Sequence, residues 1–109
     1  MSSNRYGVHW IELDPVRGSE LAKTRPAVII SRDVLNRALE KVVVCPLTSQ
    51  LHLDWRSRLQ VKVAGKDAEI AVDQIRVVSK TRIGRKIGTL SAAHAAVLRQ
   101  LICEMYGEE

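Results

Sequence analysis

Short apolar runs separated by polar turns make up most of this chain before residue 91, and they limit what it can fold into. The two clearest runs, Ala27–Ile30 and Val42–Leu47, are rich in valine and isoleucine. Runs of this length are typical of buried β-strands and are too short to cross a bilayer as helices. The sequence therefore predicts a sheet of many short strands and no membrane span.

The remaining strands are indicated by alternating apolar residues and by turn residues between them. Polar loops are expected at residues 14–24 and 51–57, and a turn at Gly65–Asp67 predicts a hairpin. Gly84 is expected to separate the last two strands. The expected strands are Val8–Leu13, Ala27–Ile30, Val42–Leu47, Leu59–Val63, Ala68–Val72, Val77–Val78 and Lys86–Leu90.

Two helices are expected as well. A short helix can begin at the capping residues Ser31–Asp33 and end near Leu39, and a longer helix begins after Ser91 and ends at Gly107. Together these elements predict one domain over residues 1–109, mainly β with a C-terminal helix packed on a small, strongly bent sheet or barrel. The expected apolar helix faces are Val34, Leu35, Ala38 and Leu39 for the first helix, and His94, Val97, Leu98, Leu101, Ile102 and Met105 for the second.

The charge of the chain is basic and uneven. Lysine and arginine number 17 against 12 acidic residues, which gives a net charge of +5. No acid occurs between Arg76 and Cys103, a segment that contains six bases. Such a segment suits a polyanion or an acidic protein partner, and equally a solvated face that serves solubility. Two Trp, two Tyr and no Phe make a stacking platform of several interleaved aromatics unexpected.

The cysteines and the N-terminus predict a cytoplasmic protein. Cys45 and Cys103 lie in hydrophobic surroundings and are expected to be buried thiols, and two cysteines do not build a disulfide scaffold. Residues 1–5 carry no apolar signal segment.

Familiar catalytic and metal motifs are missing from the sequence. Three histidines and two cysteines are scattered singly, so neither a metal nor a cofactor is expected. His94, on an apolar helix face, is expected at the margin of the core. His52 lies in a loop and could do chemistry, but nothing pairs with it in the sequence.

Two polar residues stand at strand ends. Arg25 opens one buried strand and Thr48 closes another. A guanidinium near a threonine hydroxyl suits the binding and stabilisation of a phosphate. Alternatively, Arg25 pairs with a nearby acid such as Glu20, and Thr48 simply ends its strand.

The sequence resembles the MazF/PemK family of toxin ribonucleases. The resemblance covers nearly the whole chain, in the family's order and spacing. Its most specific part is a Gly-Ser-Glu and Arg-Pro block followed by a strand that ends in Pro-x-Thr. The matching blocks are Trp10–Glu20, Arg25–Ser31, Val43–Ser49, Asp73–Arg82 and Arg85–Ser91.

The resemblance implies an SH3-like bent β-barrel, of the kind found in MazF and CcdB, and a homodimer. It implies the toxin of a type II toxin–antitoxin system: a sequence-specific, metal-independent endoribonuclease that cuts single-stranded RNA, mRNA included, and so inhibits translation and growth. It also implies a cognate antitoxin whose acidic C-terminal tail occupies the RNA groove.

Matched position by position, the family's catalytic arginine and threonine fall on Arg25 and Thr48, beside the Gly-Ser-Glu loop. Glu20 is a candidate general base, or a residue that only orients Arg25. The expected RNA-binding residues are Ser19, Ser49, Gln50, Arg56, Gln74 and Arg82.

The chemistry expected of such a site is attack by the 2′-hydroxyl of the RNA on the adjacent phosphorus. Arg25 would neutralise the phosphorane and Thr48 would bind a non-bridging oxygen. The alternative is a CcdB-like toxin that binds gyrase and cuts nothing, because such toxins share the barrel.

Overall fold

The computed structural model describes residues 4–13 and 24–107 of the chain. These residues form a seven-stranded antiparallel sheet, two α-helices and two short 3-10 helices. The strands are β1 (Gly7–Glu12), β2 (Thr24–Ile29), β3 (Lys41–Thr48), β4 (Arg58–Val63), β5 (Lys66–Ala71), β6 (Arg76–Ser79) and β7 (Ile83–Thr89). The helices are α1 (Asp33–Ala38), η1 (Val72–Gln74), η2 (Lys80–Arg82) and α2 (Ala92–Tyr106).

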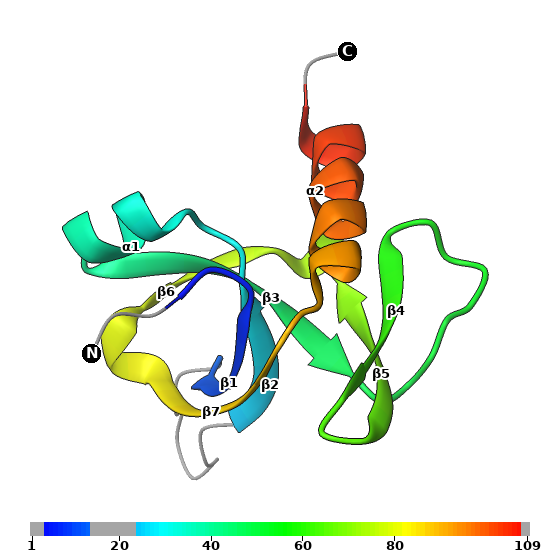
Figure 1. Cartoon of the computed structure of the whole chain (residues 1–109), viewed down its shortest axis with the longest axis horizontal. Coiled ribbons are helices and arrows are strands. Elements are labelled where there is room, and N and C mark those ends of the chain that lie inside the picture. The colour runs from blue at the N-terminus through cyan, green and yellow to red at the C-terminus, as the bar shows by residue number, and fades with distance from the viewer. Residues whose placement is uncertain (1–3, 14–23, 108–109) are drawn as a thin grey trace, which may run out of the picture.

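The central strand β3 makes the sheet curl. On one side β3 pairs with β2. On the other side its first half pairs with β6 and its last two residues, Leu47 and Thr48, pair with β5. A strand that pairs with two different strands along the same edge bends between them. The hairpin of β4 and β5 therefore turns away from β1, β2 and β7 (Figure 1). The expectation of a mainly β, bent barrel-like fold with a C-terminal helix is confirmed.

Helix α2 closes the larger of two apolar clusters. Leu98 is fully buried and Ala95 nearly so, whereas Leu101, Ile102 and Met105 pack against the cluster at its margin. Ser91 caps the helix as expected, because its Oγ accepts the His94 N–H at 3.1 Å. The buried members of this cluster are Val8, Val28, Ile30, Cys45, Leu47, Val61, Ile70, Val72, Leu90 and Leu98.

The second cluster lies on the opposite face of β2 and β3. Ala27 and Ile29 of β2 and Val42 and Val44 of β3 are buried in it. Side chains alternate along a strand, so on this face Arg25 follows Ala27, and Thr48 follows Val44 and Pro46. The second core therefore ends at the two polar side chains that the sequence singled out.

Helix α1 differs from the expectation. Its N-cap is Arg32, which makes no side-chain cap, and its buried residue is Asn36 at 1% exposure. Asn36 faces the sheet because Ser31 Oγ contacts its Oδ1 at 2.5 Å and also accepts the Val43 N–H at 3.0 Å. The predicted apolar face is therefore wrong, and Val34, Leu35 and Leu39 are exposed.

Two predictions about helix α2 are also wrong. Cys103 is exposed, although Cys45 is buried as expected. Val97 is 46% exposed. The helix packs on the cluster through Leu98, Leu101, Ile102 and Met105, and Val97 and Cys103 are not among the residues packed there.

Turn positions shift by a few residues. The β4–β5 hairpin turns at Ala64 and Gly65, both with positive φ, and Lys66 already pairs with Val63. Strand β2 begins at Thr24, inside the expected loop. Gly84 lies within β7, where a Cβ would come 2.9 Å from the Trp10 carbonyl oxygen, so glycine permits the close approach of β1.

Candidate active site

Strand register places Arg25 and Thr48 opposite each other. The pairs Ile29↔Val44, Val28↔Cys45 and Ala27↔Pro46 define the β2–β3 ladder. Two further steps in the same register bring Arg25 across from Thr48. Residues that face each other on neighbouring strands have Cβ atoms about 5 Å apart.

The ladder itself stops short of these residues. Pro26, which the register places opposite Leu47, has no N–H to donate to β3. Arg25 is exposed and Thr48 is half-buried. The adjacent ends of β2 and β3 thus present a cation and a hydroxyl at the surface.

Two hollows flank the pair, and Arg25, Leu47 and Thr48 line both. The first hollow, of about 400 Å³, is polar and basic. The second, of about 440 Å³, is more apolar. Because the two hollows share these residues, they adjoin at the pair, and the two together are called the groove below. The first is completed by Leu13, Pro46, Gln50, His52, Arg58, Ala71, Gln74 and Arg76, and the second by Trp10, Pro26, Ser49, Val63, Ala64, Lys66, Asp67, Ala68, Arg85 and Ile87.

The Thr48 hydroxyl is oriented by its neighbour. Its Oγ1 accepts the main-chain N–H of Gln50 at 3.1 Å. With that lone pair occupied, the hydroxyl hydrogen is available to donate. Arg25 makes no hydrogen bond or ion pair with any other described residue, so its fork of donors also faces the groove.

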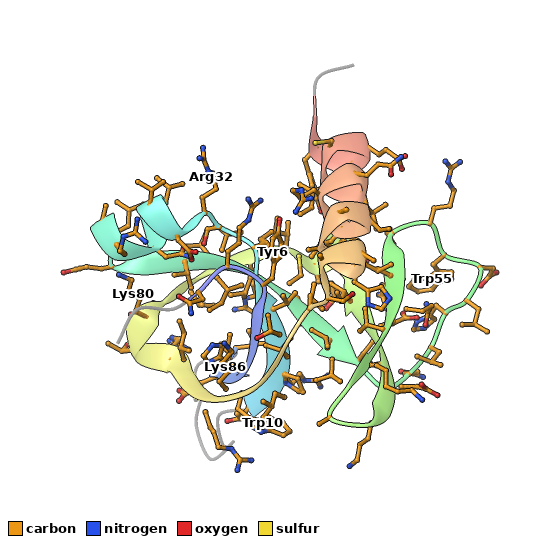
Figure 2. The ribbon with its side chains drawn as sticks, viewed as in Figure 1. Tyr6, Trp10, Arg32, Trp55, Lys80 and Lys86 are labelled. Carbon is orange, nitrogen blue, oxygen red and sulfur yellow. The ribbon has the colours of Figure 1, made fainter. Side chains whose placement is uncertain are left out.

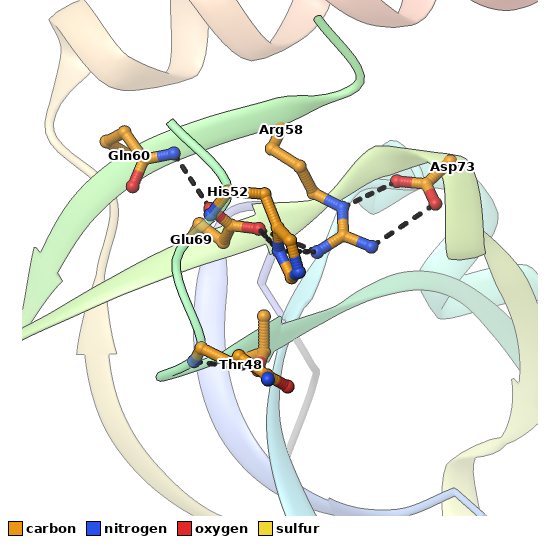
Figure 3. A network of polar contacts seen from close by, with 7 residues as sticks. Thr48, His52, Arg58, Gln60, Glu69 and Asp73 are labelled. Carbon is orange, nitrogen blue, oxygen red and sulfur yellow. Dashed lines mark hydrogen bonds and ion pairs between the residues drawn. The ribbon is translucent and has the colours of Figure 1, made fainter. Parts of the chain in front are cut away.

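A charged network lies along the first hollow (Figure 3). The fully buried carboxylate of Glu69 on β5 accepts from Arg58 Nη1 at 2.6 Å, from Gln60 Nε2 at 2.9 Å and from the His52 main chain at 2.6 Å. His52 Nδ1 lies 2.8 Å from Oε2, the carboxylate oxygen that Arg58 also contacts. Arg58 extends the network to Asp73 through Nε at 2.8 Å.

The network sets the ionisation of its carboxylates. Burial alone would raise the pKa of Glu69, but the hydrogen bonds from His52, Gln60 and Arg58 outweigh it and lower the pKa to about 2. The hydrogen bond from Arg58 likewise lowers the pKa of Asp73. Both groups are therefore carboxylates at neutral pH, and they neutralise Arg58.

The other expected site residues are spread more widely. Gln50 and Gln74 line the first hollow and Ser49 lines the second. Arg56 is exposed in the β3–β4 loop, and Arg82 lines a separate hollow and donates to the Glu12 carbonyl oxygen. Ser19 and Glu20 lie outside the described residues.

The acid-free segment does not form one basic patch. Arg76 lines the first hollow and Arg85 the second. Lys80 and Lys86 lie on η2 and β7, on the opposite side of the view in Figure 2 from Trp55. Only part of the excess charge therefore faces the groove.

Sequence reasoning missed the partners of His52. The sequence showed no partner for His52, but in the structure Glu69 of β5 and Arg58 of β4 lie beside it. A signal existed: Glu69 interrupts the apolar run Ala68–Val72, an expected strand, and a carboxylate buried in such a run requires partners.

These features define a small curled-sheet protein with an open, basic groove. A family model described as PemK-like, MazF-like toxin of type II toxin–antitoxin system matches residues 4–106. Endoribonuclease MazF9 of Mycobacterium tuberculosis is 33% identical over 108 residues, which cover 90% of this chain and 92% of that protein. Endoribonuclease EndoA of Bacillus subtilis is 33% identical over 92 residues, 80% of this chain and 79% of that protein. This chain therefore belongs to the PemK/MazF family of toxins, as the resemblance implied.

Solved structures agree with the fold. The Mycobacterium tuberculosis toxin MazF-mt6 matches 94% of this chain and 98% of its own, with a TM-score of 0.79 and 23% identity. MazF of Deinococcus radiodurans matches 99% of both chains, with a TM-score of 0.81 and 19% identity.

Within residues 4–13 and 24–107, no helix is long and apolar enough to cross a membrane. In the same residues, no group of three or more His, Cys, Asp or Glu side chains is placed to hold a metal ion.

Proposed function

We propose that this chain is an endoribonuclease toxin that cuts single-stranded RNA at specific sequences. The observation that carries the proposal is the Arg25–Thr48 pair at the middle of a groove, in a chain whose relatives are named endoribonucleases. Cleavage of mRNA in the cytoplasm would inhibit translation and growth.

The proposed reaction uses the RNA's own 2′-hydroxyl as nucleophile. Arg25 binds the scissile phosphate through two donors and neutralises the charge that develops on the phosphorane. Thr48 donates its hydroxyl hydrogen to a non-bridging oxygen, and the Gln50 N–H holds that hydroxyl in place. Nucleotides on either side of the phosphate occupy the two hollows, where Ser49, Gln50 and Gln74 are placed to contact them.

Alanine variants of the pair test the assignment. Arg25→Ala and Thr48→Ala should each lower the single-turnover cleavage rate of a long RNA about 10²–10³-fold and leave the fold intact, because neither side chain is buried. Arg25→Lys should restore little, since an ammonium lacks the planar fork.

Matched controls are Arg32→Ala and Thr89→Ala, which remove the same side chains at exposed positions outside the groove. Near wild-type cleavage by both groove variants would refute the site. If the wild-type protein cuts no RNA and instead inhibits gyrase, the CcdB-like alternative replaces this proposal.

The cognate antitoxin is proposed to compete with RNA for the groove. One solved relative is an endoribonuclease in complex with its cognate antitoxin. An acidic tail and an RNA strand would both be drawn to Arg25, Arg76 and Arg85. RNA affinity should fall more steeply with salt, because phosphate contacts release counterions. Labelled RNA bound to Thr48→Ala protein should be displaced by antitoxin, and a stable ternary complex would contradict a shared groove.

A homodimer is proposed as the working form. Val34, Leu35 and Leu39 leave an apolar patch on α1 that is about half exposed. Light scattering should give twice the chain mass for the wild type and the single-chain mass for Leu35→Glu. The control Leu53→Glu, at a residue that is 76% exposed in the β3–β4 loop, should stay dimeric.

A further inference from the structure

His52 borders the groove beside the Arg25–Thr48 pair, and the mechanism above gives it no part. Its ring is held on two sides: Nδ1 contacts Glu69 Oε2 at 2.8 Å, and one face stacks on Trp55 with ring centroids 3.9 Å apart. The side chain is 25% exposed, and it lines the first hollow. In Figure 3 the ring is directed from Glu69 toward the end of β3, where Thr48 lies.

The hydrogen bonds assign the tautomer of this ring. An ionised carboxylate only accepts hydrogen bonds, so Nδ1 must carry the hydrogen that it shares with Glu69. Arg58 Nη1 lies 3.2 Å from Nδ1 but 2.6 Å from Glu69 Oε2, so it donates to the carboxylate. In the neutral ring, Nε2 therefore keeps an unshared electron pair, and it makes no hydrogen bond within the described part of the chain.

Charged groups from several elements surround the ring. Glu69 on β5 contacts Nδ1, and Arg58 on β4 forms an ion pair with the same carboxylate. Asp73 on η1 forms a second ion pair with Arg58. Arg25 and Arg76 line the same hollow as the ring. His52 is thus oriented by a carboxylate and lines a hollow that also contains cations.

We propose that His52 is the general base of RNA cleavage and that Glu69 is the residue that positions it. This inference rests on the ribonuclease activity proposed above. Nε2 takes the proton of the 2′-hydroxyl, and the electron pair of that O–H bond becomes the new bond to phosphorus. The P–O5′ bond breaks, its electron pair leaves with the 5′-oxygen, and that oxygen takes a proton from water. The products are a 2′,3′-cyclic phosphate and a 5′-hydroxyl, and His52 then returns its proton to the solvent.

A histidine that only braces the β3–β4 loop would show the same contacts, so the test separates bracing from proton transfer. Asparagine places an amide nitrogen near the position of Nδ1 and keeps the bond to Glu69, but it has nothing at Nε2. His52→Asn should therefore keep its RNA affinity within about twofold, while the single-turnover rate falls about 10²–10⁴-fold. His94→Asn, at a half-buried histidine of α2 that lines neither hollow, is the matched control.

The pH profile provides a readout that bracing would not change. The wild-type rate should rise tenfold per pH unit at acidic pH and then level off, because only the neutral ring can accept the proton. This dependence of the rate on pH should be absent in His52→Asn.

A substrate with sulfur in place of the 5′-oxygen distinguishes a base from an acid. Its leaving group needs no acid, so it should not restore the cleavage rate of His52→Asn. Rescue would mean that His52 is the acid, and the assignment as base would be overturned.

The outcomes separate this inference from the activity on which it rests. If wild-type protein cuts RNA and Thr48→Ala does not, but His52→Asn cuts at full rate with an unchanged profile, His52 is not the base. If the wild-type protein cuts nothing, the proposed function itself fails. Urea denaturation shows whether His52→Asn is folded. Should it not be, the wild-type profile decides, and a rate that does not rise with pH at acidic pH overturns the proposal.

Discussion

Replacement of Glu69 by glutamine should reveal how much the buried network stabilises the fold. Glu69 is fully buried and accepts hydrogen bonds from His52, Arg58 and Gln60. Glutamine has nearly the same shape, but it removes the negative charge. Its NH₂ group would also face one of those donors, and Arg58, whose side chain is 4% exposed, would lose its closest partner.

The size of the effect follows from the pKa of Glu69. Folding lowers this pKa from 4.5 to about 2, which corresponds to about 3 kcal/mol of stability at neutral pH. Loss of one partner from a buried ion pair typically costs about 3–5 kcal/mol, in agreement with that figure. For a chain of this size, we expect the melting temperature to fall by about 10–15 °C.

The sign of the pH dependence follows from the lowered pKa. The carboxylate stabilises the fold fully above pH 4.5, and this contribution disappears as the pH falls toward 2. The difference in unfolding free energy between wild type and Glu69→Gln should therefore be constant above about pH 5 and shrink below it. Urea denaturation at one protein concentration and several pH values measures it.

A matched control is available on the same strand. Asp67 is 72% exposed and lies 3.7 Å from Lys62, also exposed, so Asp67→Asn should change the unfolding free energy by less than about 1 kcal/mol at any pH. If Glu69→Gln costs no more than Asp67→Asn, the network does not stabilise the fold as argued. A large cost that is independent of pH would mean that shape, rather than charge, is responsible.

Two further predictions concern the reaction and the thiols. Cleavage should persist in EDTA and leave a 5′-hydroxyl end, because the substrate supplies the nucleophile and Arg25 the positive charge, and RNA with 2′-deoxyribose at the cut position should resist. A requirement for Mg²⁺ or a 5′-phosphate end in the products would contradict this. A thiol reagent at pH 8 should modify the exposed Cys103 within minutes, whereas Cys45, whose pKa is raised to about 12 by burial, should react only on unfolding. Mass spectrometry of the modified peptides distinguishes the two.

The strands and helix α2 could be predicted from the sequence because their signals are local. Apolar runs at Ala27–Ile30 and Val42–Leu47, and the cap at Ser91, each depend on residues close together in the chain. Helix α1 was predicted with the wrong face, since the contact that orients Asn36 comes from Ser31 and β3 rather than from apolar periodicity.

The site shows the same division between local and distant causes. Arg25 and Thr48 were found because strand ends can be located by pattern and because the family motif covers both residues. The partnership of His52 with Glu69 joins positions 17 residues apart, and the curl of β3 that brings β5 beside this loop has no local signal. A buried acid in the sequence indicates that a partner is needed, but the fold decides which residue provides it.

The arginines that line the first hollow illustrate why composition alone could not locate the site. Arg58 donates to two carboxylates, Glu69 and Asp73, and they neutralise its charge. Arg25 has no such carboxylate among the described residues, although it is exposed at the middle of the groove. A phosphate that enters the groove would have to compete with two carboxylates for Arg58, and with none of the described ones for Arg25. The two arginines thus have different surroundings: Glu69 and Asp73 hold Arg58 in the wall of the hollow, whereas Arg25 is available for the phosphate that we propose it binds.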